Sequence, residues 1–384
     1  MTAFKADAPT VVVGIPVHNE ADCIAPMLRS FAAQNTAVRF AVLLLMNNCT
    51  DATRTVVEAL SPALPFPVHA LTRRLGRDRA NAGTARRLAM QAAARLTPLD
   101  GFLLSTDADT VLPPNWVEAN LAALRQGVDA VAGRALIDPV DETALPAHMV
   151  ANEERVQLLT TLLDQIDWLI DPDPADPWPR HTENSGASIG VSLHAYHRVG
   201  GIPAMKLGED RAFFEALRHE DARIRHAPEI TVTVSGRLHG RAKGGMADTM
   251  RRRMSQPDTF LDSNIEHANT RMVRALLRRA VRRAWSEGPH GGQRRLLRSL
   301  CLPPGQLRAA LNSPTFGLAW HQIETTSPAL RHLPVPNGER EAEITRAQRI
   351  VASLDATSGV GIARQPAFAG PSQAAGRAVG AALS

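Results

Sequence analysis

The sequence predicts an α/β protein built on a parallel, doubly wound sheet, with a helical extension toward its C-terminal end. Three observations carry this prediction. Short apolar runs rich in valine, isoleucine and leucine alternate with amphipathic helical stretches over about the first 110 residues. A polar cluster ends three of these runs, reading "HNE", "NNCTD" and "TDAD". Arginine-rich helical segments replace the alternation from about residue 251 onward.

The alternating part begins with "TVVVGIPV", a β-branched run typical of a strand that is buried on both faces. In chain order we expect strands at 10–17, 40–51, 68–71 and 100–109, and helices at 24–31, 52–60 and 81–96. Ligands of parallel α/β sheets bind at the carboxyl ends of the strands. All three polar clusters lie at such ends. The sequence therefore predicts a binding site at this edge of the sheet.

The later segments are less regular. We expect a helix at 115–124, a strand at 128–137, a helix at 207–220 that begins with two acids, and a strand at 229–241 that runs into a basic loop. The proline-rich stretch "DPDPADPWPR" (171–180) cannot lie inside a helix or strand, because each proline removes a backbone donor. We expect it, together with 137–154, to form variable loops that select the acceptor. The predicted domains are 1–250 for the sheet, 251–357 for a basic helical extension and 358–384 for a disordered tail.

Composition excludes several classes of protein. The net charge of +5 and the pI near 9.7 come from arginine and favour phosphate or carboxylate partners. Three scattered cysteines without a CxxC pair argue against a structural zinc site or a disulfide framework. One tyrosine and 4% aromatic residues leave few stacking platforms, so we expect no nucleic-acid partner. No secretory signal and no transmembrane-length apolar run is present, which predicts a cytoplasmic protein.

Two aspartates, Asp107 and Asp109, end the apolar run in "LLSTDADT". They have two explanations. They are solvated residues of a turn, or they hold a divalent ion that bridges to the phosphates of a nucleotide. Carboxylate oxygens suit Mg²⁺ or Mn²⁺. The position among the other strand-end clusters favours the ion.

The order of these motifs resembles the nucleotide-sugar glycosyltransferases of family 2, which have the GT-A fold. The matching segments are "VVVGIPVHNEADCI", "LLMNNCTDATRTVV", "ANAGTARRLAM", "LSTDADT", "VGGIP" and "GEDRAFFEALR". Each is weak alone, but their order and spacing over residues 10–250 are specific. The resemblance does not extend past about residue 255.

The resemblance implies a metal-dependent, inverting transfer of a hexosyl-type sugar from a nucleotide-diphosphate donor to an acceptor hydroxyl. It implies Asp109 as the metal ligand, Asp107 near the donor sugar or ribose and the metal, and Asp210, beside Glu209, as the base that takes the acceptor proton. The residues implied around the nucleotide are Pro16, Asn19, Glu20, Asn47, Asn48, Asp51, Asn81 and Gly83. Without the resemblance, Glu209 and Asp210 could equally be acids that complement the helix dipole, and Gly83 could be a packing glycine.

The sequence differs from the family pattern at the end of the second strand, and the loop after the last predicted strand offers further site residues. Members of the family usually carry an acid at the end of the second strand, but this chain reads "MNN", so the nucleotide base stays open. His239 is the predicted third metal ligand, although a single histidine at a strand end is more often only exposed. Arg237, Arg241 and Lys243 would close over the diphosphate as a basic lid, or form a solvated loop.

The arginine-rich helix after residue 255 has three interpretations: a solvated face, a membrane-surface helix suited to a lipid-linked acceptor, or nucleic-acid binding, which is the weakest. Its arginines are Arg271, Arg274, Arg278, Arg279, Arg282 and Arg283. A glycan or a small molecule would serve as acceptor equally well. The alternative functions are a retaining GT-A transferase, a sugar-phosphate nucleotidyltransferase and a catalytically inactive scaffold. The acid in "GIPVHNE" argues against the nucleotidyltransferase, and retention of all three aspartates argues against the scaffold.

Overall fold

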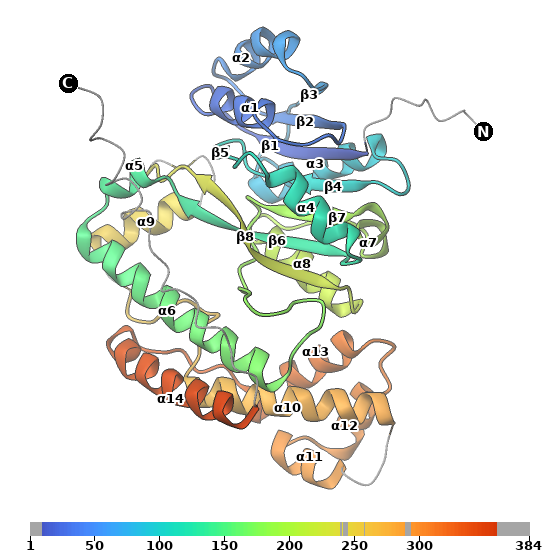
Figure 1. Ribbon diagram of the computed structural model, residues 1–384, viewed down its shortest axis with the longest axis vertical. Coiled ribbons are helices and arrows are strands. Elements are labelled where there is room, and N and C mark those ends of the chain that lie inside the picture. Colours follow the sequence, from blue (N-terminus) through green and yellow to red (C-terminus); the bar gives the residue numbers. More distant parts are fainter. Residues whose placement is uncertain (1–9, 239, 241–244, 257, 289–292, 359–384) are drawn as a thin grey trace, which may run out of the picture.

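The computed structural model describes residues 10–238, 240, 245–256, 258–288 and 293–358 (Figure 1). The described strands join in one sheet of the order β3-β2-β1-β4-β7-β6-β8-β5. The strands are β1 (Val11–Val17), β2 (Phe40–Asn47), β3 (Val68–Arg73), β4 (Phe102–Ser105), β5 (Thr110–Val111), β6 (Ala130–Ile137), β7 (Ile189–Ser192) and β8 (Ile224–Val234).

Helices flank this sheet and continue beyond it. Those of the first 220 residues are α1 (Ile24–Ala32), α2 (Thr53–Leu60), α3 (Ala82–Leu96), α4 (Trp116–Arg125), α5 (Pro139–Thr143), α6 (Ala147–Ile170), α7 (Leu193–Arg198) and α8 (Glu209–His219). Those that follow are α9 (Met246–Ser255), α10 (Ala268–Glu287), α11 (Gln293–Leu300), α12 (Pro304–Leu311), α13 (Phe316–Thr326) and α14 (Arg340–Ser358).

The sheet is parallel only in part. Strands β3, β2, β1 and β4 run parallel to one another, as the sequence predicts. Strand β7 is inserted between β4 and β6 and runs antiparallel to both. Strand β7 was not predicted, because a four-residue run of small and apolar residues shows no clear strand or helix period. The sheet is therefore mixed, and its parallel half carries the strand ends discussed below.

Both faces of the sheet are covered, which explains why its strands are continuously apolar. Val11, Val13 and Ile15 face the core shared with α1 and α4, whereas Val12 faces the core shared with α3, α7 and α8. Helix α3 crosses β1 so closely that a Cβ on Gly14 would lie 3.1 Å from the carbonyl oxygen of Ala89. This close packing fixes α3, and with it the residues at its N-terminal end, against the carboxyl end of β1.

The C-terminal helices form a second layer that includes α6 from the first half of the chain. In Figure 1, α6 runs alongside α14, and the two share a buried apolar cluster with α10. Helices α10 to α13 enclose a second cluster. Much of 137–154, expected as a variable loop, is helical in α5 and α6. The predicted boundary at residue 250 falls inside α9 and stays a prediction, and the predicted tail lies outside the described residues except for its first residue.

Most arginines of α10 form ion pairs with acids of neighbouring segments. Arg271 contacts Asp167 at 2.6 Å, Arg274 contacts Glu266 at 2.8 Å and Glu324 at 2.7 Å, and Arg278 and Arg282 both contact Asp171. The guanidinium of Arg282 also lies 4.0 Å from the ring centre of Phe316. Four of the six arginines thus bind the helical layer together, while Arg279 and Arg283 remain exposed.

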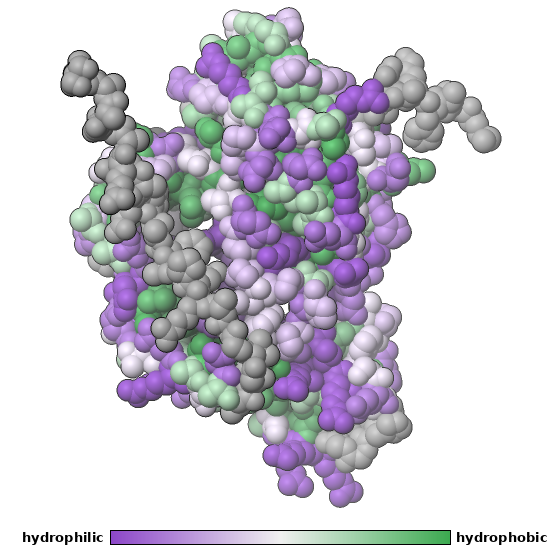
Figure 2. Space-filling model, in the orientation of Figure 1, coloured by the Kyte–Doolittle hydropathy of each residue, from purple (hydrophilic) through white to green (hydrophobic). Residues whose placement is uncertain are grey.

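Hydrophilic side chains cover most of the face shown in Figure 2, with apolar residues scattered among them. Within the described ranges, no helix combines the length and the apolar character needed to cross a lipid bilayer.

Candidate active site

The carboxyl ends of β1, β2 and β4 meet at one edge of the sheet, because the three strands are parallel neighbours. The loop after β1 contacts the loop after β2 through Asn19, whose backbone adopts a left-handed φ of 53°. The Oδ1 atom of Asn19 accepts a hydrogen bond of 2.7 Å from the amide of Thr50. Two of the three predicted polar clusters are therefore joined directly.

Asp51 and Asn48 use their side chains to shape the same loops. Asp51 accepts from the amide of Ala21 at 3.0 Å and from the amide of Thr53 at 3.0 Å, where α2 begins. Burial opposes its ionisation, but these bonds and that from the Thr53 hydroxyl hold the pKa of Asp51 below its usual value. Asn48 exchanges two hydrogen bonds with the backbone of Leu75. These predicted nucleotide-site residues form the wall of the site.

The remaining predicted nucleotide residues lie around this wall. Pro16 and Asn47 belong to the ends of β1 and β2, and Asn47 is buried. Asn81 caps α3 by accepting from the amide of Thr84 at 2.9 Å. A Cβ on Gly83 would lie 2.3 Å from the carbonyl oxygen of Met205, so glycine lets the segment before α8 approach α3.

Arg86, on α3, is the centre of a buried cluster that the sequence analysis missed. Its guanidinium forms an ion pair with Asp107 and a 3.0 Å ion pair with Glu209, from the start of α8. It also donates to the Ser105 hydroxyl at 3.1 Å and to the carbonyl of Gly186 at 2.9 Å. Burial alone would lower the pKa of Arg86, but the two carboxylates outweigh it and raise that pKa. Arg86 therefore stays protonated, and its positive charge neutralises the carboxylate of Asp107.

A second arginine, Arg237, lies beyond β8 and compensates Asp109. Its guanidinium makes bonds of 2.6 and 2.7 Å to the two carboxylate oxygens of Glu20 and lies 3.0 Å from Asp109. Burial and the adjacent charge of Asp107 raise the pKa of Asp109 to about 6, although Arg237 works against this shift. The cluster is more open than that of Arg86, because the Arg237 side chain is 23% exposed and that of Arg86 is 6% exposed.

Glu209 and Asp210 begin α8 but have different surroundings. Glu209 is buried and paired with Arg86. Asp210 is half-buried, and its Oδ2 atom accepts a 2.9 Å hydrogen bond from the amide of Gly186. Since Gly186 also binds Arg86 through its carbonyl, the same segment orients both acids. Of the two, Asp210 is the carboxylate that an incoming molecule can reach.

The proposed third metal ligand, His239, and the lid residues Arg241 and Lys243 lie outside the described residues. Among the residues that are described, no third histidine, cysteine or acid completes a three-ligand group with Asp107 and Asp109. The two groups that do form elsewhere are Glu215, His219 and His321, and His267, Glu339 and Glu343. In this structure Arg86 pairs with Asp107, and Arg237 pairs with Asp109.

Sequence reasoning missed Arg86 and placed Arg237 in a lid. Arg86 stands in the motif "ANAGTARRLAM", on a helix otherwise made of small residues. The sequence contained one indication of its role: an arginine near the start of a helix that packs against the strand ends. Arg237 was predicted as part of a lid, but its partners are the acids Glu20 and Asp109.

Comparison with known proteins agrees with this arrangement. The family described as "Glycosyl transferase family 2" matches residues 12–172. No curated protein matches the sequence. A mannosyltransferase, PcManGT from Pyrobaculum calidifontis in complex with GDP-Man and Mn²⁺, is similar in structure at 17% identity and a TM-score of 0.43, over 94% of this chain and 78% of that chain.

TarS 1–349 of S. aureus in complex with UDP-GlcNAc is similar at 17% identity and a TM-score of 0.45, over 91% of this chain and 92% of that chain. Glucosyl-3-phosphoglycerate synthase from Mycobacterium tuberculosis, in complex with Mn²⁺, UDP and phosphoglyceric acid, has 16% identity and a TM-score of 0.41, over 66% and 82%. These likenesses are distant, and the family match carries the assignment. The predicted GT-A type of sheet with C-terminal helices is confirmed. Residues 12–172 of this chain therefore form a segment that matches glycosyl transferase family 2, a family of glycosyltransferases.

Proposed function

We propose that this chain is a metal-dependent, inverting glycosyltransferase that moves a sugar from a nucleotide-diphosphate donor to an acceptor hydroxyl. The observation that carries the proposal is the meeting of Asp107, Asp109 and Asp210 around one edge of the sheet, with Arg86 connecting two of them through direct bonds to Asp107 and Gly186. Such an edge is where parallel α/β sheets bind ligands. Asp107 and Asp109 are the proposed metal ligands, and the nucleotide would lie against the wall formed by Asn19, Asn48 and Asp51.

The residues around Asp109 fit a divalent cation. Asp107 and Asp109 supply hard oxygen atoms. Burial, together with the adjacent charge of Asp107, raises the pKa of Asp109. When bound, Mg²⁺ or Mn²⁺ would neutralise the diphosphate so that it becomes a better leaving group. Arg237 already places one positive charge at this point, and its side chain is within reach of an anion that binds beside Asp109. His239 and Arg241 remain proposed contributors.

Asp210 is the proposed base. The hydrogen bond from the amide of Gly186 holds its carboxylate in one orientation. In the transfer, the acceptor oxygen forms a bond to the anomeric carbon, while the bond from that carbon to the diphosphate oxygen breaks. The acceptor proton moves to Asp210, and the nucleoside diphosphate leaves with the bonding electrons. A single displacement of this kind inverts the anomeric centre. Glu209, buried against Arg86, positions α8 and does not reach the acceptor.

The competing functions are less well supported. A nucleotidyltransferase needs a basic residue after the first strand to hold the triphosphate, but Glu20 stands there and binds Arg237. No observation favours a retaining mechanism over a single displacement. We do not extend the proposal to a membrane surface, because four of the α10 arginines that would carry such a contact are already paired with acids. A cytoplasmic location stays a prediction of the sequence.

A thermal-shift titration tests the donor site. We expect UDP or GDP with Mn²⁺ to raise the melting temperature of the wild type, and Asp109→Ala to abolish this shift. Asp100→Asn is the matched control, because Asp100 is exposed at the opposite end of β4. If every nucleoside diphosphate stabilises Asp109→Ala as much as the wild type, the donor site has been assigned to the wrong residues.

The base is tested by Asp210→Asn. We expect transfer to fall by about 10²- to 10⁴-fold, as is usual when a general base is removed, while nucleotide binding in the thermal-shift assay stays unchanged. The readout is release of nucleoside diphosphate from a panel of nucleotide sugars and acceptors. Loss of nucleotide binding in Asp210→Asn would instead indicate a structural role for this carboxylate.

A further inference from the structure

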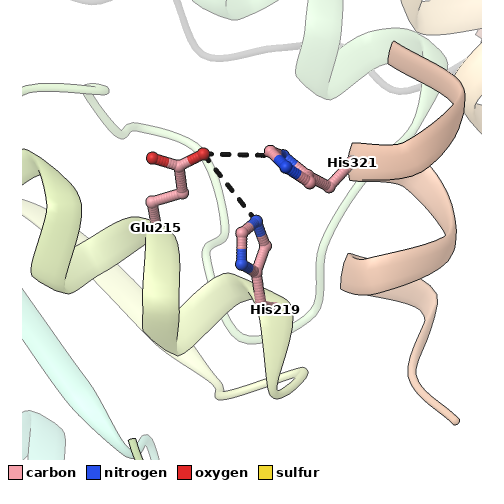
Figure 3. Close-up of side chains that lie close together, drawn as sticks. All are labelled: Glu215, His219 and His321. Carbon is pink, nitrogen blue, oxygen red and sulfur yellow. Dashed lines mark ion pairs between the residues drawn. The ribbon is translucent and has the colours of Figure 1, made fainter. Parts of the chain in front are cut away.

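A second group of polar side chains lies away from the strand ends, where α8 meets α13. Glu215 and His219 come from α8 and His321 comes from α13, and Figure 3 shows all three side chains pointing toward one another. The Oε1 atom of Glu215 lies 3.8 Å from Nε2 of His219 and 3.5 Å from Nδ1 of His321. One donor atom from each residue lies within 4.8 Å of the others.

Local structure explains why these residues meet. Glu215 and His219 are four residues apart on one helix, so their side chains project from the same face. The N-terminus of α13 is docked onto the end of α8: the carboxylate of Asp221 accepts from the amides of Phe316 and Gly317, both at 2.7 Å. Thr315 also donates to the carbonyl of His219. His321 is thereby held beside His219 by backbone contacts that are independent of any metal.

Glycine is required at this junction. A Cβ on Gly317 would lie 1.7 Å from the carbonyl oxygen of Arg218, a distance that no side chain allows. The first turn of α13 therefore lies directly against the last turn of α8, and the ring centres of His219 and His321 are 4.4 Å apart. Two imidazole rings this close repel each other when both are protonated.

Solvent has access to the cluster. The carboxylate of Glu215 is 54% exposed, and the side chains of His219 and His321 are 26% and 41% exposed, so an ion reaches them from solvent.

We infer that Glu215, His219 and His321 form a zinc-binding site. Two imidazole nitrogens and one carboxylate oxygen are a common ligand set for Zn²⁺, with bonds of about 2.0 to 2.2 Å. In a tetrahedron with such bonds, neighbouring ligand atoms are about 3.4 Å apart, close to the 3.5 and 3.8 Å found here. The three donor atoms, which lie within 4.8 Å of one another, would supply three ligands, and water would take the fourth position.

The second group of potential ligands, His267, Glu339 and Glu343, does not support a zinc site. In it, Glu343 accepts from the amide of Ala268 at 2.8 Å, from His267 at 3.1 Å and from Arg346. A carboxylate already bound by a guanidinium and a backbone amide is committed to the packing of α10 against α14. In contrast, Glu215 forms its ion pairs with the two histidines, while Arg218 acts on it only as a nearby charge.

The zinc site connects the catalytic sheet to the helical layer. Helix α8 begins with Glu209 and Asp210, and His219 ends it. A metal bound between α8 and α13 therefore fixes the angle between the helix that carries the proposed base and the helices that follow residue 251. This role is structural, and the site shares no residue with the cluster of Asp107 and Asp109.

Zinc binding is measured on the full chain, purified without a histidine tag and dialysed against a chelator. We expect one equivalent of Zn²⁺ to bind after readdition, by elemental analysis, and to raise the melting temperature. Co²⁺ in its place gives the visible absorption of a tetrahedral ion. His219→Ala and His321→Ala should each weaken Zn²⁺ binding by roughly 100-fold or more and abolish the thermal shift. His194→Ala, an exposed histidine on α7, should leave both unchanged.

The variant Asp109→Ala distinguishes the two proposed metal sites. It should still bind one equivalent of Zn²⁺, but UDP or GDP with Mn²⁺ should no longer stabilise it. The inference is overturned if the wild type takes up no Zn²⁺, or if the histidine variants bind it as tightly as the wild type. A loss of Zn²⁺ in Asp109→Ala instead would also contradict it, by placing the ion at the strand ends. His321→Gln roughly keeps the side-chain volume and serves as a folding control. If it melts like the wild type in chelator, its weaker Zn²⁺ binding is not caused by misfolding.

Discussion

Two arginines flank the paired aspartates, and they are held in different ways. Arg86 is buried on a regular helix and has four partners: Asp107, Glu209, Ser105 and the carbonyl of Gly186. Arg237 follows the last strand, is partly exposed, and has Glu20 and Asp109 as its charged partners. Both arginines thus form ion pairs with acids, but Arg86 is a buried structural cation and Arg237 is an accessible one.

The difference in burial indicates which of the two arginines a bound metal ion could displace. Removing Arg86 from its place leaves several buried groups unsatisfied, so this cation is part of the fold. Arg237 is 23% exposed and its second partner, Asp109, is 20% exposed, so a metal ion that binds Asp109 can displace this arginine, whereas Glu20 is buried. We therefore expect Arg86 to act on stability and Arg237 to act on ligand binding. Three variants test this division, in order of decreasing effect.

The largest effect is expected for Arg86→Ala. This change leaves the buried Glu209 and the partly exposed Asp107 without their counter-ion, so the free energy of unfolding should fall by about 3 to 5 kcal/mol. Urea denaturation measures the loss. Arg87→Ala is the matched control, since Arg87 is the next residue on α3 and is half-buried. Equal stability of the two variants would contradict the supporting role of the Arg86 cluster.

A smaller and pH-dependent effect is expected for Asp109→Asn. The pKa of Asp109 is raised to about 6, against about 3.9 in an unfolded chain. Protonation therefore favours the folded state: this contribution is complete below about pH 4 and is lost as the pH rises through about 6. Because asparagine mimics the neutral acid, the variant should be more stable than the wild type by about 1 to 2 kcal/mol at pH 7.5, with no difference at pH 4.

The measurement is thermal or urea unfolding in chelator across this pH range. Asp107→Asn serves as the comparison, because its carboxylate is paired with the buried Arg86. That variant should be destabilised at pH 7.5. If Asp109→Asn is also destabilised there, Arg237 compensates Asp109 as fully as Arg86 compensates Asp107, and the two clusters are equivalent.

The smallest effect is expected for Arg237→Gln in the absence of donor. Loss of this guanidinium leaves Glu20, Asp109 and Asp107 with a larger excess of negative charge, so Mn²⁺ alone should bind about tenfold more tightly at low ionic strength. Isothermal titration at pH 8 measures the affinity. Arg211→Gln, which alters an exposed arginine on α8, should not change it. Unchanged or weaker Mn²⁺ binding in Arg237→Gln would show that arginine and metal do not compete.

Much of the sheet and of the proposed site could be predicted from local patterns. Apolar runs identify β1, β2 and β4, and the polar residues that follow them lie at one edge, as the parallel order requires. Helix α8 begins at Glu209, the first acid of the predicted pair. Short or irregular segments escaped: β7 has four residues, and α6 combines a weakly amphipathic sequence with partners that lie more than a hundred residues away.

By itself the sequence determined which residues are buried and where the acids stand, because the periods of strands and helices are local properties of the chain. Only the tertiary structure decided what lies opposite each charge. It brought Arg237 to Glu20 across 217 positions, Arg86 to Glu209 across 123, and His321 to the end of α8. A charge finds its partner through the packing of distant elements, and no local pattern records that choice.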